Sequence, residues 1–168
     1  MEQAARTGLT LAGLAVLVVL GGLWGWSALT QPFPGKTTPP KCVATIVQPG
    51  EKVFPGQVTV SVFNASGRNR LASRTMSEFA NAGFGEGDTG NAPRVADVAR
   101  AAIWSSTPAS PDVRLVASRL GPATRVVRRD GPGVGVTVLV GDAYTQLVKG
   151  PPSVQARQEV EICSPPVT

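Results

Sequence analysis

The residues best suited to chemistry lie in one short polar segment. They are Asn64, Ser66, Gly67, Arg68, Arg70 and Arg74. A turn between a strand and a helix presents free backbone N–H groups, which form a natural anion site. The arginines would reinforce it, so the segment predicts binding of a phosphate or carboxylate. The alternative is a plain turn, because glycine supplies a positive φ and Asn or Ser caps helices.

Two other groups of polar residues could bind a ligand or could have a purely structural role. Asn91 lies in a Gly-Asn-Ala turn and is added to the predicted ligand-binding residues, with only Arg94 nearby. Arg125, Arg128 and Arg129 lie on one short predicted strand, with Arg125 and Arg129 on the same face. They indicate either a basic strip for an acidic partner or charges that protect an exposed edge strand.

Several kinds of active site are excluded by composition. The chain has no histidine, so no Ser-His-Asp or Cys-His arrangement can form. Its acidic residues are scattered and form no local pair for acid–base work. Two cysteines without histidine cannot complete a four-ligand metal site. We therefore predict no catalytic residue, no metal and no cofactor.

The two cysteines stand at opposite ends of the polar part of the chain. Cys42 and Cys163 leave no odd cysteine over, and exported thiols meet an oxidising environment. This favours a disulfide, which would close a loop of about 120 residues and stabilise the fold by roughly 5 kcal/mol in the chain-entropy model. Two buried free thiols are the alternative.

An uncharged apolar run from Leu9 to Leu29 decides the predicted location. About 20 apolar residues span a hydrocarbon core, and Trp24 and Trp26 suit the headgroup layer. We predict a cytoplasmic stub (1–7), a single-pass signal-anchor (8–29), a Pro- and Thr-rich linker (30–41), an exported domain (42–163) and a tail (164–168). A cleaved signal peptide and, less favoured, a buried core helix remain alternatives.

The exported part must supply the elements that position these residues. Alternation and helical spacing predict strands at 42–47, 57–63, 84–90, 100–105, 124–129, 134–140 and 154–163. Helices are predicted from Leu71 to a C′ glycine at Gly83, and from Ser110 to Leu120, with a short helical turn at 142–148. Ser66 or Asn69 is expected to cap the first helix.

The order of these elements predicts an α+β fold. It is β-α-β-β-α-β, with both helices on one face of a mixed sheet. The strand at 134–140 is expected to form a hairpin with the strand at 124–129. The last strand is expected to pair with the strand at 42–47, beside the disulfide.

Taken together, the motifs resemble the LytR-type C-terminal domain (LytR_C) family. The likeness covers residues 57–144 and rests on a V-x-V-x-N-x-S-G strand and turn, an L-A helix, a G-F turn, a G-N motif and a final V-L-V-G-D. These segments are Val58–Gly67, Leu71–Ala72, Gly83–Phe84, Gly90–Asn91 and Val138–Asp142. Such domains follow LytR-CpsA-Psr phosphotransferases or stand alone as membrane-anchored actinobacterial proteins. No phosphotransferase domain is present here, so the resemblance implies the standalone kind and no catalytic residues.

The predicted function is a non-catalytic, membrane-anchored module of the cell envelope. Its partners would be an anionic wall polymer or a LytR-CpsA-Psr-type envelope protein. The net charge of +5 suits an acidic partner, although solubility explains it equally well. Nucleic acid is not expected across the membrane. The alternatives are an enzyme acting on phosphorylated glycans, or a structural subunit whose helices pack through Gly21-x-x-x-Gly25. The sequence does not decide the oligomeric state.

Overall fold

The computed structural model describes residues 2–30, 40–94 and 96–166, with side chains at 13–27, 40–94 and 96–166. The chain divides into two compact units, residues 1–38 and residues 39–168. The first unit holds helix α1 (Glu2–Thr30). Within the described residues, no helix is both long and apolar enough to cross a membrane. The transmembrane segment at residues 8–29 stays a prediction, and most of the predicted linker lies outside the described residues.

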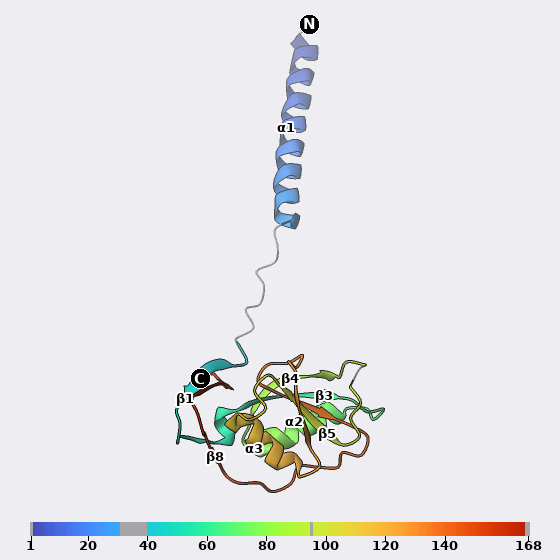
Figure 1. The fold of residues 1–168 in the computed structure, drawn as a ribbon. Helices are drawn as coiled ribbons and strands as arrows, with labels where there is room; N and C mark the ends of the chain where they lie inside the picture. Colours follow the sequence, from blue (N-terminus) through green and yellow to red (C-terminus); the bar gives the residue numbers. More distant parts are fainter. Residues whose placement is uncertain (1, 31–39, 95, 167–168) are drawn as a thin grey trace. The chain divides into compact units, whose positions relative to one another are not determined.

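The second unit is built around a five-stranded sheet (Figure 1). Its strands, in spatial order, are β4 (Gly85–Asn91), β3 (Thr59–Asn64), β7 (Val136–Val140), β5 (Ala101–Ser105) and β6 (Arg125–Arg128). β4, β3 and β7 are parallel to one another, whereas β5 and β6 run the opposite way. The predicted mixed sheet is confirmed.

Helices α2 (Leu71–Asn81) and α3 (Pro111–Leu120) cover one face of this sheet. Their apolar residues share a single core cluster with Val60, Val62 and Val138 of the central strands. The helices begin and end close to the predicted positions: Gly83 has a φ of 87°, and Ser110 precedes Pro111 at the start of α3. The opposite face holds a smaller cluster around Trp104 and Leu139.

Three predicted details are wrong. β7 does not pair with β6 but lies between β3 and β5, in the middle of the sheet. Its five residues are all buried, which suits a central strand better than a hairpin arm. Residues 142–148 form no helical turn, and the predicted last strand is divided into β8 (Val154–Gln155) and β9 (Val160–Ser164).

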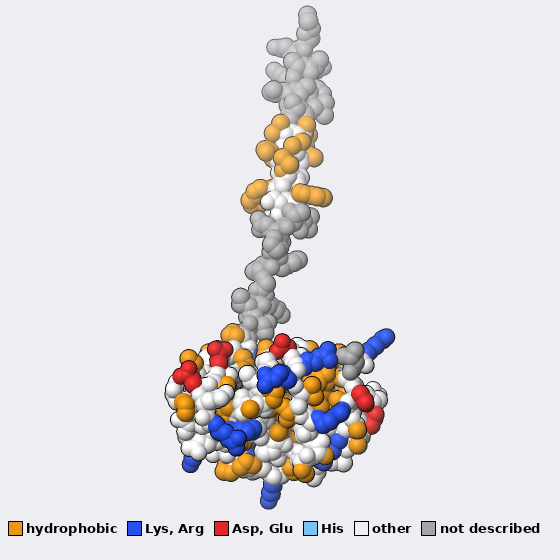
Figure 2. Space-filling view, viewed as in Figure 1, with side chains coloured by type: hydrophobic (Ala, Val, Ile, Leu, Met, Phe, Trp, Pro, Cys, Tyr) orange, Lys and Arg blue, Asp and Glu red, His pale blue; other side chains and the backbone are white. Residues whose placement is uncertain are grey.

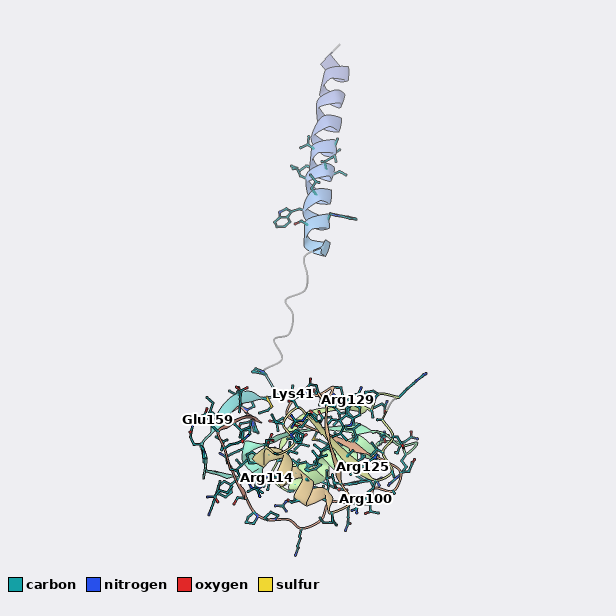
Figure 3. The ribbon with its side chains drawn as sticks, in the orientation of Figure 1. Lys41, Arg100, Arg114, Arg125, Arg129 and Glu159 are labelled. Atoms are coloured by element: carbon teal, nitrogen blue, oxygen red, sulfur yellow. A yellow bond between two sulfur atoms is a disulfide. The ribbon has the colours of Figure 1, made fainter. Side chains whose placement is uncertain are left out.

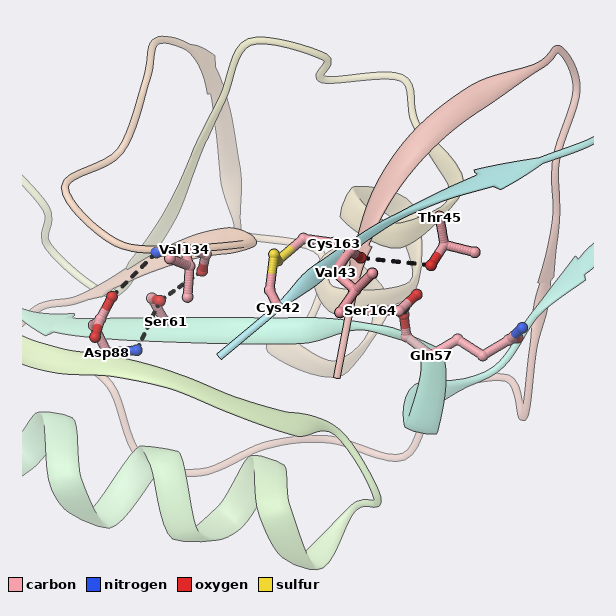
Figure 4. The surroundings of a disulfide bond; sticks show 9 residues. All are labelled: Cys42, Val43, Thr45, Gln57, Ser61, Asp88, Val134, Cys163 and Ser164. Atoms are coloured by element: carbon pink, nitrogen blue, oxygen red, sulfur yellow. Dashed lines mark hydrogen bonds between the residues drawn. A yellow bond between two sulfur atoms is a disulfide. The ribbon is translucent and has the colours of Figure 1, made fainter. Parts of the chain in front are cut away.

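Two small ribbons flank the sheet. β1 (Val43–Val47) pairs antiparallel with β9, as predicted, and β2 (Lys52–Val53) pairs with β8; a 3₁₀ turn at Pro55–Gln57 follows β2. Cys42 and Cys163 form the predicted disulfide, with their Cα atoms 5.3 Å apart (Figure 4). The disulfide ties the start of β1 to β9.

A second contact holds the same end of the domain. Lys41 Nζ lies 2.7 Å from Asp88 Oδ1, and Asp88 Oδ2 accepts a bond from the Val134 N–H. The Ser61 hydroxyl donates to Val134 O and accepts from the Asp88 N–H (Figure 4). Lys41 holds the pKa of Asp88 below its usual value. Lys41, two residues before β1, is thus bonded to β4, and Asp88 links it to the loop that contains Val134.

Candidate anion-binding site

A pocket of about 180 Å³ opens where β3 and β4 end and α2 begins. Asn64 and Asn91 are the last residues of β3 and β4, and both line it together with Arg70 and Thr89. The first turn of α2 completes the wall. In open sheets, ligands bind outside the carboxyl ends of parallel strands, which is where this pocket lies.

The start of α2 presents its backbone N–H groups uncapped. The first-turn N–H groups, those of Leu71, Ala72 and Ser73, have no acceptor within a helix. Arg70, at the N-cap position, forms no capping bond with its side chain, and the first turn contains no acidic residue. The expected caps Ser66 and Asn69 are not at this position. The positive end of the helix dipole therefore faces the pocket.

Helix α3 shows the opposite arrangement. Its first turn carries Asp112, which is largely buried and supplies a negative group to the positive helix end. Burial raises the pKa of the Asp112 carboxyl above its usual value. Of these two helices, α2 alone has no acidic residue in its first turn.

Arg70 adopts a backbone conformation that glycine favours. Its φ of 58° and ψ of 19° place it in the left-handed region, and it is the one non-glycine residue with positive φ among those described. The conformation costs a side-chain-bearing residue roughly 1 kcal/mol. Strained residues of this kind cluster at functional sites. The left-handed conformation thus keeps an arginine beside the uncapped start of α2, at a cost in stability.

The predicted turn satisfies its own polar groups. Asn64 Oδ1 accepts from the N–H and the hydroxyl of Ser66, at 3.0 and 2.7 Å, and Asn64 Nδ2 donates to Arg68 O. The Arg68 N–H donates to the Ser66 hydroxyl, and the Gly67 N–H to Asp142 Oδ1. The N–H groups of residues 66–68 are therefore occupied within the protein.

Arg68 points away from the pocket and stabilises the fold. Its guanidinium donates to Tyr144 O at 2.6 Å and to Asp142 O at 3.3 Å. Tyr144 is buried in turn, and its hydroxyl donates to Glu78 Oε2, which also accepts from the Leu147 N–H. Burial, and then the Glu78 carboxylate, raise the pKa of Tyr144 well above its ordinary value.

The structure thus divides the predicted site. It brings Asn64, Arg70 and Asn91 to one pocket, whereas Ser66, Gly67 and Arg68 serve the turn and Arg74 is exposed on α2 outside the pocket wall. Sequence reasoning missed Thr89 and Ser73. Thr89 could have been found, because it lies two residues before Asn91 in a strand and so shares its face.

Comparison with known proteins identifies the family of this chain. The family model described as LytR cell envelope-related transcriptional attenuator (LytR_C) matches residues 57–144, just over half of the chain. The chain belongs to the LytR_C family. The comparison with curated proteins found no match. One similar solved structure is the crystal structure of the soluble domain of a conserved hypothetical secreted protein from Mycobacterium marinum, with a sequence identity of 22% and a TM-score of 0.42. The alignment covers 62% of this chain and 70% of that one.

The LytR_C match has clear structural limits. It contains the complete five-stranded sheet, both covering helices and the whole pocket. It excludes β1, β8, β9 and both cysteines. The candidate site therefore belongs to the LytR_C region, and the disulfide-linked ribbon is an addition to it.

A second cavity, of about 230 Å³, lies beside the disulfide of this LytR_C protein. Its charged wall residues are Asp112 and Glu161, and no arginine or lysine lines it. A cavity with this charge would repel an anion, so it is not a candidate anion-binding site.

Proposed function

We propose that this chain is a non-catalytic cell-envelope module that binds an anionic wall polymer at the α2 pocket. Membership of the LytR_C family supports the envelope assignment. The observation that carries the binding role is the start of α2: an uncapped helix end with no acidic residue, joined to Arg70 in a strained conformation. Helix N–H groups and an arginine together recognise a phosphate or carboxylate group.

The pocket supports binding rather than turnover. Its hydroxyl groups belong to Ser73 and Thr89, and no carboxylate or other base lines the pocket with them. A hydroxyl nucleophile needs an adjacent base to become reactive. We therefore assign no covalent or hydrolytic step to the bound polymer.

We propose that the domain lies outside the cytoplasm. The disulfide between Cys42 and Cys163 supports this, because structural disulfides persist in oxidising compartments. We also propose attachment to the membrane through residues 8–29, a segment supported only by its uncharged apolar sequence. Extraction of membranes at alkaline pH should leave the full chain in the pellet; release into the supernatant would refute the anchor.

The binding role is tested with residues 39–168, which form a compact unit containing the whole core and the disulfide. The oxidised domain is titrated with poly(glycerol phosphate) and, separately, with polygalacturonate, so that phosphate and carboxylate polymers are compared. Arg70→Ala should weaken binding by about tenfold, the loss expected for a charge-assisted hydrogen bond. Lys149→Ala is the matched control, because it removes an exposed charge outside the pocket wall.

Equal binding by wild type and Arg70→Ala would refute the assignment of the pocket. Failure of the wild-type domain to bind either polymer would refute polymer binding itself. The family assignment does not depend on either result.

A further inference from the structure

Strand β6 is an edge of the sheet that has no covering element among the described residues. It pairs with β5 alone, and all four of its residues are exposed. Val126 and Val127 point to opposite faces and are 37% and 39% exposed. Exposed valines on both sides of an unpaired edge favour association with another strand.

The backbone of β6 has groups free for such a strand. The Arg129 N–H, directly after β6, donates to Ser105 O of the neighbouring strand segment at 3.2 Å. Because successive residues of a strand direct their N–H and C=O groups to alternate sides, those of Val126 and Arg128 point to the open edge. They can pair with an incoming strand without disturbing β5.

The arginines of β6 do not shield this edge. Arg125 donates to Asp97 O at 2.7 Å, and Arg128 donates to Ser106 O at 2.8 Å. Both side chains are thus bound to backbone carbonyls of the domain itself. Long charged side chains that project past an edge strand usually prevent its association with another strand. Arg125 and Arg128 do not project in this way, because both are bonded to carbonyl groups of the domain.

A pocket of about 240 Å³ lies on the helix-free side of β6. Arg125, Val127 and Arg129 line it with Trp104 and the exposed Asp97, so the pocket has two guanidinium groups and one carboxylate. The Arg129 guanidinium stacks 4.3 Å from the centre of the Trp104 ring. A stacked guanidinium keeps the N–H groups on its rim available for a carboxylate. Figure 3 labels Arg125 and Arg129. Figure 2, in the same orientation, shows basic and hydrophobic side chains interspersed on the side of the domain that faces the viewer.

A smaller pocket, of about 150 Å³, lies at the C-terminal end of β6 on the opposite side of the strand. Arg128 lines it with Val160 and the segment Thr107–Ser110. Arg128 and Val126 share the helix-covered side of the sheet, opposite to Arg125 and Arg129. A strand beside β6 would therefore direct alternate side chains toward two different pockets.

We propose that β6 receives an extended acidic segment of a partner protein as an added strand. The partner's backbone would pair with Val126 and Arg128, and its carboxylates would face Arg125 and Arg129. Its alternate, apolar side chains would lie on the side of the smaller pocket. Such addition takes affinity from backbone bonds and specificity from side-chain pockets. An acidic sugar fits less well, because Trp104 is only 6% exposed and is covered by Arg129, which leaves no open ring for stacking.

The test uses the full chain in detergent and a fluorescein-labelled peptide of alternating glutamate and valine. Val126→Pro removes the outward N–H and keeps the bonds to β5, so it should weaken binding at least about tenfold. Val126→Thr, which keeps that N–H, should bind like wild type. Reversing both charges, Arg125→Glu with Arg129→Glu, should also cost at least about tenfold, whereas Lys149→Glu should not.

A second measurement locates the binding. With Trp24→Phe and Trp26→Phe, Trp104 is the sole tryptophan, and its fluorescence should change on peptide addition. Polygalacturonate serves as the competing ligand. Binding that survives Val126→Pro, or a peptide that does not bind, overturns the proposal; polygalacturonate binding at Trp104 without peptide binding identifies a saccharide site instead. Equal unfolding midpoints establish that each variant is folded.

Discussion

At the scale of single residues, Arg70 is expected to lower the stability of the fold and to strengthen polymer binding. Glycine adopts the left-handed conformation without strain, so Arg70→Gly should raise the free energy of unfolding by about 0.5–1 kcal/mol. The same change removes the guanidinium, so polymer binding should fall about tenfold. Urea unfolding and polymer titration of the same variant measure both effects.

Arg74→Gly is the matched control for this prediction. Arg74 lies within α2, where glycine should lower the free energy of unfolding by about 1 kcal/mol. If Arg70→Gly also destabilises the protein, or leaves polymer affinity unchanged, Arg70 has no special role.

Arg68 should behave as a structural residue. Arg68→Ala leaves Tyr144 O and Asp142 O without their donor, so the free energy of unfolding should fall by about 1–2 kcal/mol. Because Arg68 does not line the pocket, polymer affinity should stay within about twofold of wild type. A loss of affinity without a loss of stability would place Arg68 in the site after all.

Tyr144 should make stability fall in alkaline solution. Its folded-state pKa is raised, so the folded protein holds the phenol proton more tightly than the unfolded chain does. This contribution is fully present below the ordinary tyrosine pKa of about 10 and is lost as the pH rises above it. Tyr144 is the sole tyrosine, so Tyr144→Phe should flatten the dependence between about pH 9 and 11. Unfolding in urea across this range checks the difference.

At the scale of elements, local signals predicted local structure well. Ser110-Pro111-Asp112 marks the start of α3, and alternating valines mark β3, because caps and alternation depend on a few neighbouring residues. The insertion of β7 between β3 and β5 depends on contacts between residues distant in sequence. The Asp130–Gly133 turn instead suggested a local hairpin.

In the candidate site, too, the contacts between residues distant in sequence could not be predicted. The sequence indicated Asn64, Arg70 and Asn91, which the strand ends bring together. It did not separate them from Ser66, Gly67 and Arg68, because that division depends on Asp142 and Tyr144, which lie about 75 residues further along the chain. The helical turn predicted at 142–148 fails in the same region, where Glu78 accepts the Leu147 N–H.

The β1–β9 ribbon should depend on its disulfide. β1 is mostly exposed, and the bond closes a loop with a sequence separation of 121. Reduction should therefore lower the free energy of unfolding by about 2–5 kcal/mol. Amide hydrogen exchange should quicken at 43–46 and 161–164, while β3 and β7 keep their protection. Equal loss of protection in all these strands would show that the ribbon and sheet form one cooperative unit.

At the scale of the whole domain, the two proposed surfaces lie toward opposite edges of the sheet. The α2 pocket is formed at β3 and β4, whereas the acidic-peptide surface follows β6. Distant sites without shared partners act independently. Arg70→Ala should therefore leave peptide affinity at β6 unchanged, and Val126→Pro should leave polymer affinity unchanged. Binding assays on both variants check this; cross-effects would show that the surfaces are coupled.

The most direct test of anion binding at α2 follows the backbone amides of the isotope-labelled domain by NMR. During titration with poly(glycerol phosphate), the account predicts saturable shifts for the N–H signals of Leu71, Ala72 and Ser73, and their loss in Arg70→Ala. Polymer binding that leaves these three signals unmoved would contradict the account, because the uncapped start of α2 would then not be where the anion binds.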